Sequence, residues 1–145
     1  MTPSMARRIL IVALYFGAIS ALVGGVLGVA ANGAGMPLDY LKGTPFGSYL
    51  GPGLILAVVI GGTQGLAAVL TQRDHPYSRI AASIAGFGMI IWIFVELAVI
   101  SEYSWLQTLY FALGAGELIL VLVLAGVLIP VARVAGERKV THVWR

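Results

Sequence analysis

Four long apolar stretches dominate this chain, and its polar residues are concentrated in the segments between and after them. The stretches cover roughly residues 9–31, 50–71, 80–100 and 105–132. Each offers the ~20 consecutive apolar residues that an α-helix needs to cross a bilayer. None shows the alternation of period two that is typical of membrane β-barrel strands. The pattern predicts an all-α protein, a four-transmembrane-helix bundle that forms one domain over residues 1–145.

The composition supports a membrane protein. Hydrophobic residues make up 59% of the 145 residues and charged residues 10%, whereas an average soluble domain is about 45–50% apolar and about 25% charged. The first stretch follows Arg7 and Arg8, as a signal peptide would. However, a secretory apolar region is only about 7–15 residues long, and this one is about 23. We therefore expect it to be retained as the first helix.

The basic residues predict the orientation of the bundle. One group of them precedes the first stretch, flanks the loop between the second and third stretches, or follows the fourth: Arg7, Arg8, Arg73, Arg79, Arg133, Arg138, Lys139 and Arg145. Only Lys42 lies on the other side. Because short cytoplasmic loops carry the excess of positive charge, we expect both the N and C termini to be cytoplasmic. The net charge of +3 is then an orientation signal and does not indicate a nucleic-acid partner.

The longest connection, residues 32–49, contains several glycines and prolines and some large apolar side chains. Pro37 favours a short helical turn through Leu38–Leu41. The large side chains of this segment, and two more at the start of the fourth stretch, are Tyr40, Leu41, Phe46, Tyr49, Tyr103 and Trp105. We interpret them as an interfacial aromatic belt that caps the outer end of the bundle. The alternative is a lid over a ligand.

Small residues recur at helical spacing in the first two stretches. The first strip is Gly17, Ala21, Gly25 and Gly28, and the second is Ala57, Gly61, Gly65 and Ala68. Smooth strips of this kind let helix backbones approach closely in a membrane. They predict packing within the bundle, with a dimer interface as the alternative.

The residue types that carry most enzyme and metal chemistry are scarce. The chain has no cysteine, which excludes disulfides, thiol redox chemistry and thiolate metal sites. Its two histidines, His75 and His142, lie outside the four stretches and are interpreted as solvated. No nucleophile with an adjacent base is visible. We expect neither a cofactor nor an enzymatic activity.

The informative residues are polar side chains at membrane depth, because a charge near the bilayer centre costs about 2.5–3.5 kcal/mol on insertion scales. At 1.5 Å per residue, Glu96 lies roughly 6 Å and Glu117 roughly 18 Å from the outer ends of their helices. Gln107, Tyr110, Gly114 and Glu117 follow the helical spacing of three and four, which places them on one face. We predict an outer tier of Glu96, Tyr110 and Gln107 with Trp92 nearby, and a middle tier of Glu117, Gln64, Thr63 and Ser20.

No lysine, arginine or histidine lies within the four predicted stretches, so neither glutamate has a cation at its own depth. Three readings stay open. The carboxyl groups are protonated and donate hydrogen bonds between helices, since burial favours the neutral form. They form a proton or cation site open to the outer face. Or a second copy or a partner helix supplies the missing cation.

Three segments carry a resemblance to a known type of protein: GTPFGSYLGPGLILAVVIGGTQGLAAVL, IIWIFVEL and YSWLQTLYFALG. They resemble small uncharacterised four-span integral membrane proteins of actinobacterial type, over most of residues 43–115. The resemblance implies a location in a bacterial plasma membrane. Small multidrug transporters also have four spans, but their working carboxylate lies in the first helix, and the first stretch here has none.

These observations favour a non-enzymatic integral membrane protein with a buried polar site around Glu96 and Glu117. It is expected to act as an accessory subunit of a membrane complex or as a binder of a small or lipid-like ligand. Its expected partners are the lipid bilayer and either another membrane protein or further copies of itself. The alternative is a small proton- or cation-coupled carrier that uses Glu117 and Glu96 as switching carboxylates.

Overall fold

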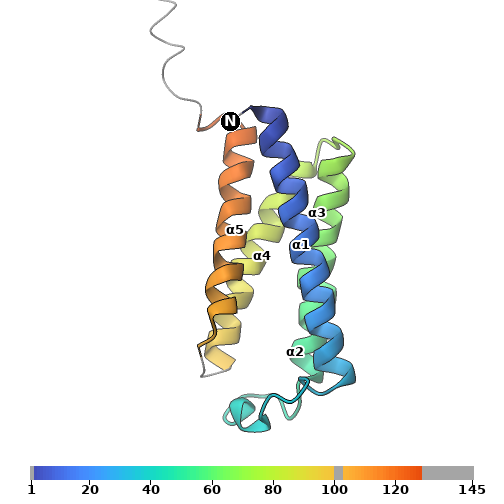
Figure 1. Ribbon diagram of the computed structural model, residues 1–145, viewed down its shortest axis with the longest axis vertical. Coiled ribbons are helices and arrows are strands. Elements are labelled where there is room, and N and C mark those ends of the chain that lie inside the picture. Colours follow the sequence, from blue (N-terminus) through green and yellow to red (C-terminus); the bar gives the residue numbers. More distant parts are fainter. Residues whose placement is uncertain (1, 100–102, 129–145) are drawn as a thin grey trace, which may run out of the picture.

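The computed structural model describes residues 2–99 and 103–128, and every regular element in these ranges is helical. The elements are α1 (Pro3–Ala30), the 3₁₀ turn η1 (Leu38–Leu41), α2 (Leu50–Leu54), the π-helix η2 (Ile55–Gly61), α3 (Gly62–Gln72), α4 (Ser78–Val99) and α5 (Trp105–Leu124) (Figure 1). The elements α2, η2 and α3 are continuous and form a single span. Within the described residues, four helices are long and apolar enough to cross a membrane. The predicted all-α, four-span class is confirmed.

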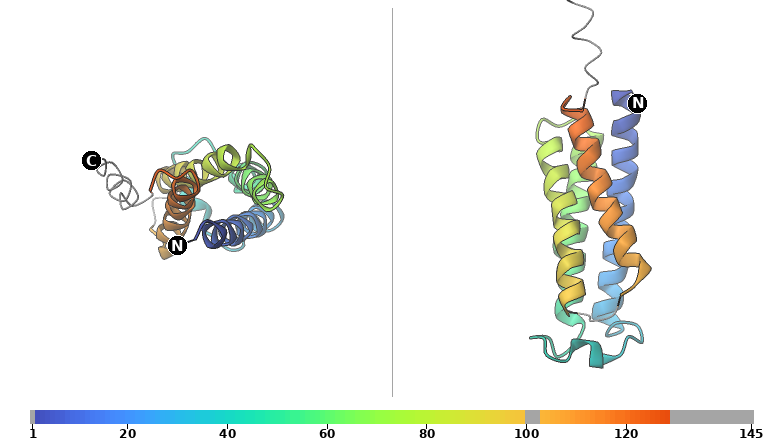
Figure 2. Two further views of the ribbon diagram at one scale, coloured as in Figure 1. Left: turned by 90° about the horizontal axis from the view of Figure 1, so that it is seen from above. Right: turned by 90° about the vertical axis from the view of Figure 1, so that its left-hand side faces the viewer.

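The spans are arranged in a ring in the order of the chain. Figure 2 shows α1, α3, α4 and α5 in sequence around the bundle, so that α3 and α5 lie diagonally opposite each other. The start of α1 and the end of α5 lie at one end (Figure 1), which we call the terminal end. The connection between α1 and α2 closes the other end, which we call the loop end.

Local backbone signals move two of the predicted boundaries. The first helix begins at Pro3, because the Thr2 side chain accepts a hydrogen bond from the Met5 N–H and Pro3 suits the first helical position. The fourth helix ends at Leu124 and not at residue 132. Gly126 adopts a φ of 76°, and the N–H of Val127 bonds to the carbonyl of Leu122 at 3.1 Å. This is a Schellman end, which glycine allows. Residues 129–132, the basic residues that follow and His142 lie outside the described ranges.

The small-residue strips bring α1 against the second span, as predicted for packing within the bundle. A Cβ atom at Gly25 would lie 2.5 Å from the Cβ of Ala57 and 2.7 Å from the carbonyl oxygen of Gly53. One at Gly28 would lie 2.9 Å from the Cα of Gly53. The two backbones are therefore in direct contact, and van der Waals packing between them holds the helix pair together in lipid.

The π-helix explains how the second span keeps this contact over its length. The residues that touch α1 are four apart: Gly53 meets Gly28, Ala57 meets Gly25, Gly61 meets Leu22 and Gly65 approaches Ala18. A spacing of four drifts around an α-helix of 3.6 residues per turn. The wider turns of η2 absorb that drift, so the strip stays on the α1 side and Gln64 is directed into the bundle.

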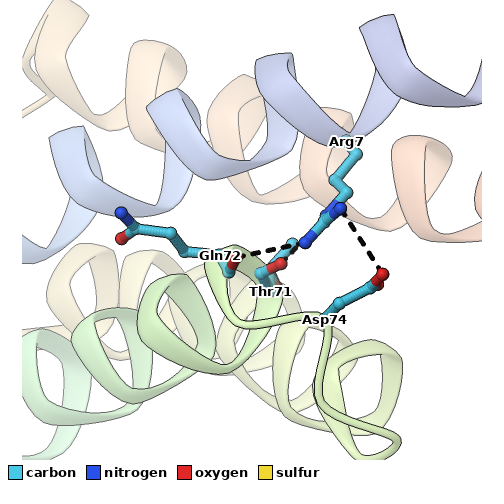
Figure 3. Close-up of polar contacts among 4 residues, drawn as sticks. All are labelled: Arg7, Thr71, Gln72 and Asp74. Atoms are coloured by element: carbon cyan, nitrogen blue, oxygen red, sulfur yellow. Dashed lines mark hydrogen bonds and ion pairs between the residues drawn. The ribbon is translucent and has the colours of Figure 1, made fainter.

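The terminal end is closed by polar contacts and by an apolar core. The Arg7 guanidinium donates to the carbonyls of Thr71 and Gln72 at 3.0 and 3.1 Å and pairs with Asp74 at 3.5 Å (Figure 3). Both carbonyls lie at the C-terminal end of α3, where a cation is favoured. Next to these Arg7 contacts, toward the middle of the bundle, lies a cluster of buried side chains: Leu10, Leu14, Ala67, Ala68, Ala82, Ala85 and Val121.

The loop end is covered by an ordered connection. The predicted turn at Leu38–Leu41 is confirmed as η1. Asn32 accepts the N–H of Tyr49 at 3.0 Å, and the Tyr49 hydroxyl donates to the Pro37 carbonyl at 2.8 Å. Tyr49 and Leu41 are buried, and burial raises the pKa of the Tyr49 hydroxyl, which keeps it a donor. The segment therefore folds over the bundle and is more than a row of aromatic side chains at the lipid interface.

The close contact at Gly25 allows a prediction about the stability of a variant. We expect Gly25→Leu to lower the unfolding free energy by roughly 1–3 kcal/mol or more, because the added side chain forces α1 from α2. Gly116→Leu is the matched control, since a Cβ there meets nothing within 4 Å. Thermal unfolding of both variants in the same detergent measures the difference. Equal stability of the two variants would contradict the packing.

The orientation predicted from the basic residues has a direct test. Because the chain has no cysteine, single cysteines at Asp39 and at His75 report the two ends separately. We expect Asp39→Cys to react with an impermeant maleimide in intact cells and His75→Cys to react only after the membrane is opened. The reverse labelling pattern would show that the bundle has the opposite orientation in the membrane.

Candidate functional site

A cavity opens at the loop end, where α4 and α5 diverge from α1 and the second span. It has a volume of about 280 Å³ and lies between α1, η2, α4 and α5. A smaller space of about 100 Å³ lies against it under the loop. Residues that line both spaces are Gly24, Met36, Leu56, Trp92 and Glu96. We call the two together the loop-end cavity. Along the second span, α4 contacts α3 extensively and η2 only sparsely, so the interior is open at this end and filled at the other.

Among the described residues that line the loop-end cavity, Glu96 is the only acidic one. It is half-buried, and the side chains of Gln107 and Trp92 are its polar neighbours. Gln107 is fixed by its second role as a helix cap. Its Oε1 accepts the Ser104 N–H at 2.9 Å, and Ser104 caps α5 in return. The amide oxygen is thus occupied, which leaves the amide N–H groups to face the carboxyl group of Glu96.

The residues of the predicted outer tier share this cavity. Glu96, Gln107, Tyr110 and Trp92 all line it, and the Tyr110 ring stacks on Phe16 of α1 at a centroid distance of 6.3 Å. A carboxyl, an amide, a phenol and an indole group therefore lie at one end of an otherwise apolar cavity.

The predicted middle tier is only partly assembled. Gln64 Nε2 donates to Glu117 Oε2 at 2.9 Å and lies 3.4 Å from the Ala85 carbonyl oxygen. The other two members bond to their own helices, because a serine or threonine in a helix reaches the carbonyl four residues back. Thr63 donates to Val59 and Ser20 donates to Phe16, both at 2.7 Å. Ser20 lines the loop-end cavity and bonds to its own helix, so it does not join the Gln64–Glu117 pair.

The Gln64–Glu117 pair lies in the interior of the bundle and joins its two diagonal helices, α3 and α5 (Figure 2). Both side chains have no exposed surface. Glycines make room around them. A Cβ at Gly17 would lie 2.9 Å from the Cδ of Gln64, and a Cβ at Gly114 would lie 2.9 Å from the Gly86 carbonyl oxygen.

Met89 separates the pair from the loop-end cavity. It lines that cavity, it is buried, and its Cε would lie 3.3 Å from a Cβ at Gly17, beside Gln64. Glu117 itself is not among the residues that line the cavity. The two glutamates thus lie in two different regions of the interior, and Met89 borders both of them.

Sequence reasoning missed the apolar residues that form this site. Met36, Leu56 and Met89 line the cavity but are indistinguishable in sequence from other apolar residues of the loop and spans. The role of Gln107 did have a signal, because Ser104 and Gln107 have the Ser-x-x-Gln spacing of a capping box.

Comparison with protein families, curated proteins and solved structures finds no match to this chain. The residues of the site are therefore the guide to its chemistry. Among the described residues, no three of His, Asp and Glu come together as a metal site would require. What the loop-end cavity offers is one carboxyl group, an amide, a serine hydroxyl and three aromatic polar side chains in an otherwise apolar enclosure.

The Gln64–Glu117 pair predicts a difference between two substitutions. Glu117→Gln keeps the volume and a neutral hydrogen-bonding group, so we expect the unfolding free energy to change by less than about 1 kcal/mol. Glu117→Ala leaves a void and an unpaired amide, and we expect a loss of roughly 2–4 kcal/mol. Thermal unfolding in detergent measures both.

Thr63→Val is the matched control on α3, because its hydroxyl bonds only to its own helix. We expect it to behave like the wild type. An equal loss for Glu117→Gln and Glu117→Ala would show that the bundle needs a carboxylate at this position.

Proposed function

We propose that this protein is a non-enzymatic binder of a small amphiphilic ligand, with a cationic head group and a short apolar tail. The observation that carries the proposal is the loop-end cavity with Glu96 in its wall. A ligand amine would pair with the carboxylate of Glu96, and its tail would lie along Leu56 and Met36.

The size and lining of the cavity support this ligand class. Small-molecule sites start at about 300 Å³ and are mostly apolar with a few placed polar groups, and the main space here has about 280 Å³. The Trp92 and Tyr110 rings provide faces that attract a cation. A half-buried carboxylate without a counter-charge is costly, so a cationic ligand that pairs with Glu96 gains free energy on binding.

The loop supports binding by covering the site. Met36, Leu41, Phe46 and Tyr49 line the part of the cavity beneath it. The loop is held closed by the Tyr49 hydrogen bonds to Asn32 and Pro37. We therefore favour the lid interpretation of this segment over the aromatic belt.

The carrier alternative uses Glu117 and Glu96 in one path. In this conformation Glu117 is fully enclosed, and Met89 fills the space between it and the cavity. This arrangement favours a binding protein over a carrier. Crosslinking in native membranes tests whether the binder also serves as an accessory subunit of a larger complex.

The proposed location is a bacterial plasma membrane, with the loop end on the outer side. Four apolar helices support a multi-pass membrane protein. The distribution of basic residues supports this orientation, and the resemblance to small actinobacterial four-span proteins supports the bacterial membrane.

Titration of decylamine into the protein in phosphatidylcholine nanodiscs tests the binding proposal. The parent protein for this experiment carries Trp105→Phe and Trp144→Phe, so that Trp92 is its sole tryptophan. We expect saturable quenching or enhancement of its fluorescence. Glu96→Gln should weaken the affinity by roughly 10- to 100-fold, because a hydrogen bond to a charged group contributes about 1.5–3 kcal/mol.

Two controls isolate the role of Glu96. Asp39→Asn removes a carboxylate from the exposed loop at the same end and should leave the affinity unchanged. Decanol has the same tail without the charge and should bind Glu96→Gln as well as it binds the parent protein. Equal affinity of decylamine for Glu96→Gln and Asp39→Asn would refute the proposal.

A further inference from the structure

The Gln64–Glu117 pair contains two oxygen atoms that lack a hydrogen-bond donor. Gln64 Oε1 and Glu117 Oε1 are both buried and have no partner among the described residues. Both atoms are acceptors when the carboxyl group is ionised, so the missing component is a proton, a cation or a donor group. A buried acceptor left unpaired in an apolar environment is costly.

The space around the pair selects among these occupants. The Gly17 backbone lies so close that a Cβ there would be 2.9 Å from both Gln64 Cδ and Gln64 Oε1. One turn before Glu117 on α5, the Gly114 backbone is in direct contact with the Gly86 backbone of α4. Neither part of the loop-end cavity reaches Glu117. A proton is the occupant that requires no additional volume.

We propose that Glu117 is a proton-binding site whose proton exchanges with the loop-end cavity past Met89. The Gln64 amide suits both protonation states, because it has a donor nitrogen and an acceptor oxygen. Its N–H donates to the carboxylate, and after a turn of the amide its oxygen accepts the O–H of the carboxylic acid. The inference does not depend on the ligand proposed for the cavity.

The groups that face Glu117 leave it without a charged partner. From α3 it meets the neutral Gln64, and the residues packed beside this pair are Gly17 of α1, which has no side chain, and Met89 of α4. On α5 itself the nearest titratable residue is Tyr110, two turns away, and Glu96 lies in the cavity beyond Met89. Arg7, Arg8 and Arg79 lie at the terminal end. Desolvation without a counter-charge favours the protonated carboxyl group.

Met89 is suited to act as a movable wall. Its unbranched thioether side chain has three rotatable bonds and adapts to irregular gaps. It contacts the region of Gly17 and Gln64 on one side and the loop-end cavity on the other. Rotation of this side chain would connect the pair to the cavity without any movement of a helix.

Infrared spectroscopy of the full protein in lipid films tests the proton site. We expect a carbonyl band of a protonated carboxyl group at neutral pH that shifts in D₂O. This band should be lost in Glu117→Gln and retained in Glu96→Gln. If Glu117→Gln does not fold, Glu117→Asp replaces it, and the band should then shift in frequency. A band that is unaffected by either change at residue 117 would overturn the proton site.

The rate of the D₂O shift tests the route. Met89→Ala should accelerate the exchange at Glu117 by about tenfold or more, whereas Ile93→Ala, which enlarges the same cavity one turn farther along α4, should leave the rate nearly unchanged. Equal rates in Met89→Ala and the parent protein would overturn the route past Met89. If the parent protein does not bind decylamine but shows the carbonyl band of Glu117, the ligand proposal alone would be rejected.

Discussion

The hydrocarbon interior of a membrane offers no water to a buried polar side chain, and this constraint shapes the centre of the bundle. Glu117 and Gln64 cannot be satisfied by lipid, so they bond to each other across the diagonal between α5 and α3. The helices must converge around them to exclude lipid and water, which requires small residues. Gly17, Gly86 and Gly114 supply that proximity. The polar pair and the glycines are therefore one structural feature.

The two ends of the bundle differ because different interactions close them. At the terminal end, Arg7 holds the end of α3, and alanines and leucines fill the space between the helices. At the loop end, the tight α1–α2 contact at Gly25 and Gly53 draws the second span toward α1 and away from α4. The space left on the α4 side is lined by apolar residues and Glu96 and is covered by the connection that ends at Tyr49. Close packing in one helix pair thus creates the cavity beside it.

Helical periodicity predicted much of the candidate site, because residues three and four apart must share a face. Gln107, Tyr110 and Glu117 do face the interior, and Gln64 accompanies the small-residue strip. Depth alone did not show which polar residues bond to each other, and Ser20 and Thr63 bond to their own helices instead of joining the Gln64–Glu117 pair. It also gave no account of Met89, whose importance comes from its position between two compartments and not from its chemistry.

The sequence by itself determined the class of the protein, because the length of each apolar stretch and the cost of exposing backbone polar groups to lipid leave only helices as a solution. It also determined the contact strips and the polar face of α5, which follow from the helical repeat. The tertiary structure decided which polar groups meet, where the helices diverge and which side chains separate Glu96 from Glu117. Those features depend on the ring order of the helices and on the π-helical turns of η2, and neither is encoded in the periodicity of a single segment.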